Sequence, residues 1–204
     1  KRFMGGFLTL AVVFTACLYL IQEGDWLMAV IFYVLASVGN AGANIFYDSL
    51  LPHVARPDEM DRVSSKGFSL GYLGGGILLL INLVWYMKPD WFGFPDANTA
   101  VRVSFLSVAV WWVIFSIPIF RNVPEPPRSA PEGAQGNVFK EGLGRLVETF
   151  REIKEYRQLA KFLVAFWLYA DGIGTIIKMA TIYGAEIGIG TADLAGALLL
   201  TQVV

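Results

Sequence analysis

The chain has 204 residues, of which 55% are hydrophobic and 16% are charged, and its mean hydropathy is +0.55. In soluble domains about a quarter of all residues are charged, so this composition excludes an ordinary soluble domain and indicates a membrane protein. The 16 Lys and Arg residues nearly balance the 17 Asp and Glu residues, and a net charge of -1 predicts no nucleic-acid partner. A single cysteine, Cys17, excludes an internal disulfide framework.

Apolar runs long enough to cross a bilayer recur along the chain. A spanning helix needs roughly 20 such residues. The runs predict membrane helices at about 3–21, 26–51, 64–86, 99–120, 158–184 and 194–204. The predicted fold class is therefore all-α, a polytopic membrane protein with about six transmembrane helices, the last of them truncated. Because the chain starts at Lys1 and stops inside an apolar run, we expect an internal piece of a longer protein, with no signal peptide to remove.

The second predicted helix carries a polar stripe. Asn40, Asn44 and Asp48 are spaced by four residues, with Tyr47 beside them, so they share one helix face. We expect Asn40 and Asn44 either to line a cavity or to hydrogen-bond a neighbouring helix, and the pattern leaves both alternatives open. Asp48 lies about 33 Å along the helix from Trp26, close to the membrane boundary. A structural role is favoured for Asp48 over a role in a solute path.

A loop rich in charges of both signs follows this helix. We expect Asp61 and Arg62 in it to bridge neighbouring helix ends, as a cytoplasmic gate would. Ser64 or Ser65 is expected to cap the next helix.

Glycines recur every fourth residue in the third predicted helix, at Gly67, Gly71 and Gly75. Small residues at this spacing predict a surface at which two helices cross closely. A phosphate-binding loop is the weaker alternative, because these glycines lie in an apolar run and lack the Lys-Ser/Thr pair of a P-loop.

The helices fall into two groups separated by a linker. We assign residues 1–120 to one bundle, 121–156 to the linker and 157–204 to the start of a second bundle. The Pro-rich part of the linker, at 123–133, predicts an extended segment. Apolar residues then recur at spacings of three and four over 138–155, which predicts an amphipathic helix. We expect it to lie on the membrane surface or beneath the bundle, as a strap or as a regulatory docking site.

Asp171 is the most informative polar residue, because an Asp near the bilayer centre costs about 2.5 to 3.5 kcal/mol on insertion scales. It lies about 15 Å into its apolar run, and Thr175 and Lys178 share its helix face. Gly172 and Gly174 beside it would allow a local break that frees backbone carbonyls for a ligand. Asp171 is expected to bind substrate or a proton, or alternatively to make an interhelical bond. Lys178 either lines the same path or reaches the outer interface.

The basic residues show one consistent sidedness. With Lys1 in the cytoplasm, alternate loops place 13 of the 16 Lys and Arg residues on that side, together with the linker at 121–156. Lys88 and Arg102 fall on the opposite side, where Arg102 is expected to anchor its helix at the interface.

Four motifs in order resemble the vacuole-effluxer-like (autophagy-related) family of the major facilitator superfamily. They are FYDSLLPH at 46–53, DRVSSKG at 61–67, GYLGGG at 71–76 and LYADGIGT at 168–175. The resemblance implies twelve helices in two halves of six, with this chain as about helices three to eight. It also implies that the fourth and seventh helices, which carry the Asn40 and Asp171 stripes, line the central path. Ala170 departs from the family, in which Asn is common at that position.

The function expected is that of a secondary active transporter of a small polar solute, working by alternating access and coupled to protons. The resemblance implies amino acid efflux, in a bacterial plasma membrane or a eukaryotic vacuolar membrane. A non-transporting membrane scaffold or receptor that uses the amphipathic helix is the alternative. No catalytic arrangement or metal-ligand spacing is recognisable, so we expect neither an enzyme nor a cofactor. The expected partners are a solute, a proton and the lipid bilayer.

Overall fold

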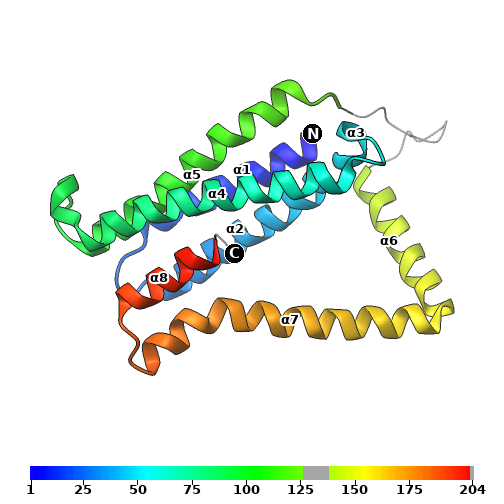
Figure 1. Ribbon diagram of the computed structural model, residues 1–204. Helices are drawn as coiled ribbons and strands as arrows, with labels where there is room; N and C mark the ends of the chain where they lie inside the picture. Colours follow the sequence, from blue (N-terminus) through cyan, green and yellow to red (C-terminus); the bar gives the residue numbers. More distant parts are fainter. Residues whose placement is uncertain (126–137, 203–204) are drawn as a thin grey trace. The chain divides into compact units, whose positions relative to one another are not determined.

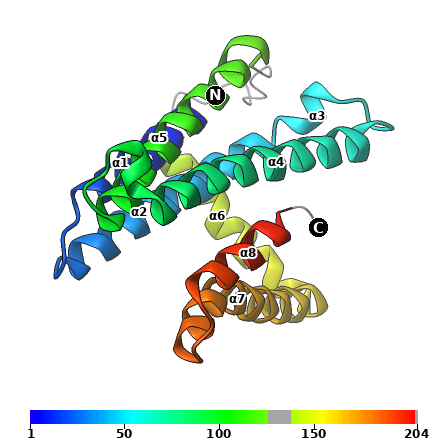
Figure 2. The same ribbon diagram turned by 60° about the vertical axis from the view of Figure 1, so that its left-hand side comes forward.

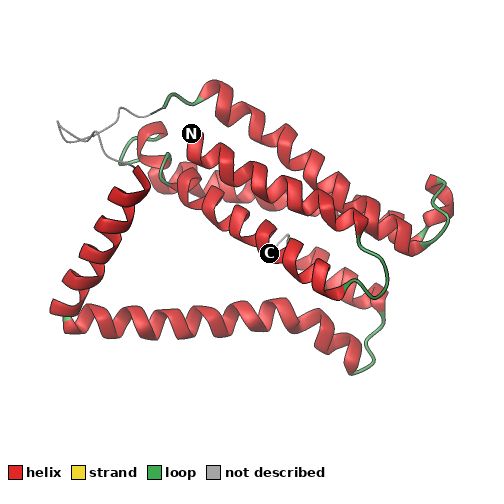
Figure 3. Ribbon diagram, turned by 180° about the vertical axis from the view of Figure 1, so that it is seen from behind, coloured by secondary structure: helices red, strands yellow, loops and turns green. Residues whose placement is uncertain are grey.

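The computed structural model describes residues 1–125 and 138–202. Residues 126–133 of the Pro-rich segment lie outside the described residues. Within the described ranges all regular elements are helical, so the all-α class is confirmed (Figure 3). The chain divides into two compact units, Lys1–Pro127 with Ala197–Val204, and Arg128–Gly196, which we describe separately.

The first unit contains four helices that are long and apolar enough to cross a membrane, which are labelled in Figure 1. They are α1 (Arg2–Cys17), continued by the 3-10 turn η1 (Leu18–Leu20); α2 (Trp26–Asp48), followed by the short α3 (Leu51–Val54); α4 (Met60–Met87), followed by the 3-10 turn η2 (Pro89–Phe92); and α5 (Ala97–Asn122). Each contains a long apolar stretch, because polar side chains are costly in lipid, and each is helical, because a backbone in lipid must satisfy its hydrogen bonds within the helix.

The second unit contributes the fifth such helix. Its elements are α6 (Val138–Glu155), α7 (Arg157–Glu186) and the start of α8 (Thr191–Thr201). α7 meets the length and composition of a membrane span, whereas α8 is a shorter apolar helix of 11 residues. Within residues 1–125 and 138–202, five candidate spans and one short apolar helix therefore stand where about six membrane helices were predicted. The fold is that of a polytopic membrane protein.

α1 and α2 pack against each other through glycine and alanine. A Cβ added at Gly39 would lie 2.5 Å from the backbone nitrogen of Ala11 and 2.8 Å from the carbonyl oxygen of Phe7. At Gly42 it would lie 2.4 Å from the Phe7 ring. Ala11 is fully buried, and Ala43, one helical turn after Gly39, is 7% exposed. Small residues thus let two membrane helices approach to backbone contact.

α5 contacts both α1 and α4. Ala100 and Ala109 are buried on α5, and the Ser107 hydroxyl hydrogen-bonds the Asn82 side-chain oxygen of α4 at 2.9 Å. Polar side chains inside apolar helices pair in this way because lipid offers them no partner. Sequence reasoning missed this pair.

Arg102 near the start of α5 joins two helices. Its Nε donates a hydrogen bond of 2.7 Å to the carbonyl oxygen of Tyr19 in η1, and its guanidinium lies 5.0 Å from the centre of the Tyr19 ring. A 3-10 turn leaves its last carbonyls without helical partners, and the arginine satisfies one of them. Arg102 therefore fastens the end of the α1–η1 segment to α5, and its role as an interfacial anchor stays a prediction.

Two predicted helix ends are wrong. α4 begins at Met60, so Ser64 and Ser65 lie inside it and neither caps it. Residues 60–66 contain no helix breaker, and Asp61 in the first turn favours an earlier start because it complements the helix dipole. α2 ends at Asp48 rather than at residue 51, since Pro52 has no N–H to donate to the carbonyl four residues earlier.

Asp96 caps α5 and gives the protein a pH-dependent contact. Its carboxylate accepts a hydrogen bond of 2.6 Å from the backbone N–H of Thr99. The Thr99 backbone and hydroxyl groups, and then the positive charge of Arg102, hold the pKa of this carboxyl below its ordinary value of 3.8. A carboxylate at an N-cap satisfies a backbone N–H that the helix leaves free.

We expect Asp96→Ala to lower the thermal stability at neutral pH. Because the folded pKa is depressed, the stabilisation is present above the ordinary value of 3.8 and is lost as the pH falls through the lower folded value. The difference in Tm between wild type and variant should therefore shrink in acid, as thermal unfolding in detergent between about pH 7 and pH 3 would show. Asp96→Asn is the control, because Asn caps well without titrating. A Tm difference that stays constant with pH would contradict the assignment.

Candidate functional site

The predicted stripe on α2 lies on one exposed face of the helix. Asn44 Nδ2 donates a hydrogen bond of 3.2 Å to Asn40 Oδ1, one turn earlier on the same helix. Sequence reasoning weighed a cavity lining against a bond to another helix, and the observed bond is neither. The pair still presents unused amide donors and acceptors to a ligand, because each side-chain amide can make more than one hydrogen bond.

A cavity of about 720 Å³ lies where α2 ends. Its walls come from the last turn of α2, from α3, from the first half of α4 and from the last turns of α5. Tyr47, Asp48, Gly67 and Gly71 all line it. The structure thus brings together four residues that the sequence singled out for separate reasons.

The chemistry of this cavity is mainly apolar, with a few polar groups. Asp48, Ser64 and Asn122 are polar members of its wall, and Tyr47 adds a ring and a hydroxyl. Asp48 is the last residue of α2, where the negative end of the helix dipole disfavours a carboxylate. It makes no salt bridge with any described residue, so a structural ion pair is not observed there. A cationic or hydrogen-bond-donating group would suit this position.

The glycines of α4 leave space in the cavity wall. A Cβ added at Gly71 would have no described atom within 4 Å, and one at Gly67 would lie 3.7 Å from the Tyr47 hydroxyl. Close helix packing occurs instead at Gly39 and Gly42 of α2. The packing surface proposed for Gly67, Gly71 and Gly75 therefore stays a prediction.

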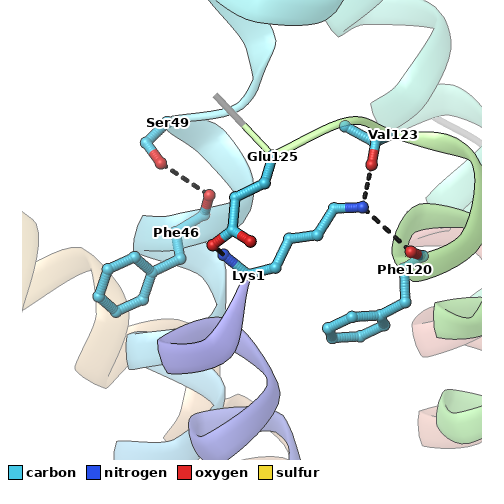
Figure 4. Close-up of polar contacts among 6 residues, drawn as sticks. All are labelled: Lys1, Phe46, Ser49, Phe120, Val123 and Glu125. Atoms are coloured by element: carbon cyan, nitrogen blue, oxygen red, sulfur yellow. Dashed lines mark hydrogen bonds and ion pairs between the residues drawn. The ribbon is translucent and has the colours of Figure 1, made fainter. Parts of the chain in front are cut away.

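The side chain of Lys1 binds the end of α5 near this cavity. Its Nζ donates hydrogen bonds to the carbonyl oxygens of Phe120, at 3.0 Å, and Val123 (Figure 4). A cation at a helix C-terminus satisfies free carbonyls and complements the dipole. Asp61 and Arg62 are exposed at the start of α4, and among residues 1–125 and 138–202 neither makes a salt bridge. Their gating role stays a prediction.

Asp171, Thr175 and Lys178 form the second stripe, on α7. All three are exposed on one face, and Asp171 is 14 residues from the start of this 30-residue helix, close to its middle. α7 is continuous through Gly172 and Gly174, so the local break that these glycines would allow does not occur in this helix. In lipid a broken backbone would lose hydrogen bonds, which outweighs the roughly 1 kcal/mol by which glycine weakens a helix.

Sequence reasoning missed the part of the cavity wall that α5 supplies. Phe115, Pro118, Ile119 and Asn122 are spaced by three and four residues and line the cavity together. That spacing is visible in the sequence, and Asn122 at its end is its polar signal. In the part of the chain that the structure describes, no three His, Cys, Asp or Glu side chains gather as a metal site.

Long apolar helices with polar stripes define an integral, multi-pass membrane protein. The family described as "Vacuole effluxer Atg22 like" matches residues 1–204, and the chain belongs to it. The MFS-type transporter YxiO of Bacillus subtilis (strain 168) is 37% identical over 205 residues, covering 100% of this chain and 47% of that protein.

Fungal relatives are more distant. Autophagy-related protein 22 of Yarrowia lipolytica (strain CLIB 122 / E 150) is 29% identical over 66% of this chain and 25% of that protein. The protein of the same name from Saccharomyces cerevisiae (strain ATCC 204508 / S288c) is 24% identical over 92% of this chain and 39% of that protein. The chain thus spans half or less of the curated relatives it matches. No solved structure matches it.

Proposed function

We propose that this chain is part of a secondary active transporter that moves a small polar solute by alternating access. Family membership supports this proposal, since the matching family is described as effluxer-like and the Bacillus subtilis relative is named as a transporter. In such proteins two bundles rock around a site near the membrane midplane. We assign residues 1–120 to the first bundle, 121–156 to the cytoplasmic linker and 157–204 to the start of the second bundle.

The observation that carries the proposal is the position of Asp171. A carboxylate in the middle of a membrane-long helix is costly, so it marks a solute or proton pathway by default. Asp171 would bind a proton or a cationic group of the solute, and Thr175 would add a hydroxyl one turn away. Lys178 lies about 10 Å further along the same face. A carboxylate and an ammonium on one face suit a zwitterion, which supports an amino acid as the solute class.

We assign the polar stripe of α2 to the same pathway because of the hydrogen-bonding side chains that it carries. The Asn40 and Asn44 amides would replace part of the hydration shell of a polar solute. Tyr47 and Asp48 would act at the cavity where α2 ends. Proton coupling rests on the carboxylates, since a carboxylate that alternates between lipid-shielded and aqueous surroundings changes its affinity for a proton.

A flux assay tests the proposal. The full-length protein, reconstituted in proteoliposomes, is given a panel of radiolabelled amino acids and other small polar solutes under an imposed pH gradient. We expect at least one amino acid to move, with a rate that depends on the gradient. Flux of none of them, together with a fully packed, dry centre in a full-length structure, would overturn the proposal in favour of a membrane scaffold.

A further inference from the structure

An apolar stripe and two acidic residues lie on opposite sides of α6, although the basic residues of the helix are spread around its circumference. At 100° per residue, Leu143, Leu146 and Val147 fall within an arc of about 100° on one side. Glu148 and Glu152 fall on the opposite side of the helix. A charged face opposite an apolar stripe is typical of a helix that lies in the plane of a membrane surface, because the charges stay in water while the stripe enters the lipid.

The apolar side of α6 has no cover among the described residues. Leu143 is 52% exposed, and Leu146 and Val147 are each 55% exposed. Three neighbouring apolar side chains on one helix face form a surface that needs a partner. Arg151 lies between the apolar stripe and the acidic side, where a long basic side chain reaches the phosphate level of a bilayer.

The short connection between α6 and α7 indicates which partner covers the apolar side of α6. α6 ends at Glu155 and α7 begins at Arg157, so Tyr156 alone separates α6 from a candidate membrane span. The two helices run in different directions (Figure 2). Tyr156 leaves the helical conformation, with φ -95° and ψ 73°, and the chain turns a corner there. Arg157 and Lys161 open α7, as basic residues do at the edge of the hydrocarbon. The C-terminal end of α6 is therefore tied to the level of the lipid headgroups.

We propose that α6 lies in the headgroup layer of the leaflet at which α7 begins, with Leu143, Leu146 and Val147 inserted at the acyl boundary. Glu148 and Glu152 then face the water. The partner is the lipid bilayer itself, and this proposal needs only that α7 crosses the membrane. It stands whether or not the protein transports a solute.

Spin labels on opposite sides of α6 test this placement. In the full-length protein, with Cys17→Ala and any other cysteine removed, Leu146→Cys and Glu148→Cys are labelled separately in nanodiscs of phosphatidylethanolamine and phosphatidylglycerol. Collisions with oxygen, which concentrates in lipid, are compared with collisions with a water-soluble nickel chelate. We expect the ratio of oxygen to nickel accessibility to be several-fold higher at residue 146 than at residue 148.

Two other results would overturn the proposal. A label at residue 146 that is shielded from both reagents would place the apolar side against protein, and a label open to nickel would place it in water. Val147→Cys and Glu152→Cys form a second pair, which repeats the comparison if one of the first variants does not fold. Size-exclusion chromatography of each labelled protein confirms that it is folded before its accessibility is read.

Discussion

Asp171→Asn is expected to reduce solute flux through the full-length protein by about tenfold or more. A tenfold change corresponds to an increase of about 1.4 kcal/mol in the activation free energy of transport. Asn keeps the size and hydrogen-bonding capacity of the side chain but carries no charge and does not titrate. Asp171 lies in the middle of a 30-residue helix, far from both ends, so its charge does not serve to hold a helix end at the membrane surface. Initial rates in proteoliposomes, with and without an imposed pH gradient, provide the measurement.

Glu186→Gln is the matched control for this result. Glu186 is the last residue of the same helix, where a carboxylate is close to water and costs little. The control should transport at the wild-type rate with unchanged pH dependence. If Asp171→Asn also keeps wild-type flux and pH dependence, Asp171 makes only an interhelical bond. A fall in flux that is accompanied by a lower Tm would likewise point to a structural role.

Gly39→Ala is expected to destabilise the protein by about 1 to 3 kcal/mol, the usual effect of overpacking a tight contact. The added Cβ would lie 2.5 Å from the backbone nitrogen of Ala11 and 2.8 Å from its Cα. Neither atom belongs to a side chain that can rotate away, so α1 and α2 would have to separate. Thermal unfolding of the full-length protein in detergent, followed by the loss of the monodisperse peak, gives the change in Tm.

Gly6→Ala provides the comparison on the neighbouring helix. A Cβ at Gly6 would have no described atom within 4 Å. Replacing glycine by alanine in an open helix position stabilises the helix by up to about 1 kcal/mol, so this variant should match or exceed the wild-type Tm. Equal Tm values for the two variants would show that the α1–α2 contact at Gly39 is looser than the structure indicates.

Long-range features of the fold are readable from the sequence because the bilayer imposes them. A helix must be apolar over its whole crossing, which is why runs such as 26–51 and 158–184 predict α2 and α7. Local features depend on single residues. Pro52 ends α2 by removing one hydrogen bond, and Asp61 allows α4 to begin before the serines that were expected to cap it. The pattern of apolar residues does not predict either of these effects.

Helix contacts could not be predicted in the same way. Spacing of small residues identified Gly67, Gly71 and Gly75, yet the close backbone approach is at Gly39, and Gly42 packs against the Phe7 ring. α2 and α4 both have small residues spaced by four, and this spacing does not say which neighbouring helix each face meets. The hydrogen bond between Ser107 and Asn82 was missed for the same reason, since it depends on the register of α5 against α4.

The candidate site was predictable where one helix contains it and not where several meet. The stripes on α2 and α7 follow from spacings of three and four residues. The cavity at Tyr47 and Asp48 depends on how the ends of α3, α4 and α5 come together around them, and no spacing within a single helix contains that information.

The single non-helical residue between α6 and α7 has a mechanical consequence. A change in the tilt of α7 would reach α6 only through the φ and ψ angles of Tyr156, because no other non-helical residue lies between the two helices. α6 has 18 residues and is therefore a rigid arm about 27 Å long. A small rotation at the corner becomes a long sweep at the far end of this arm. The start of α6 is thus the point on this unit where a motion of α7 would be largest and easiest to record, for example by distance measurements between two labels.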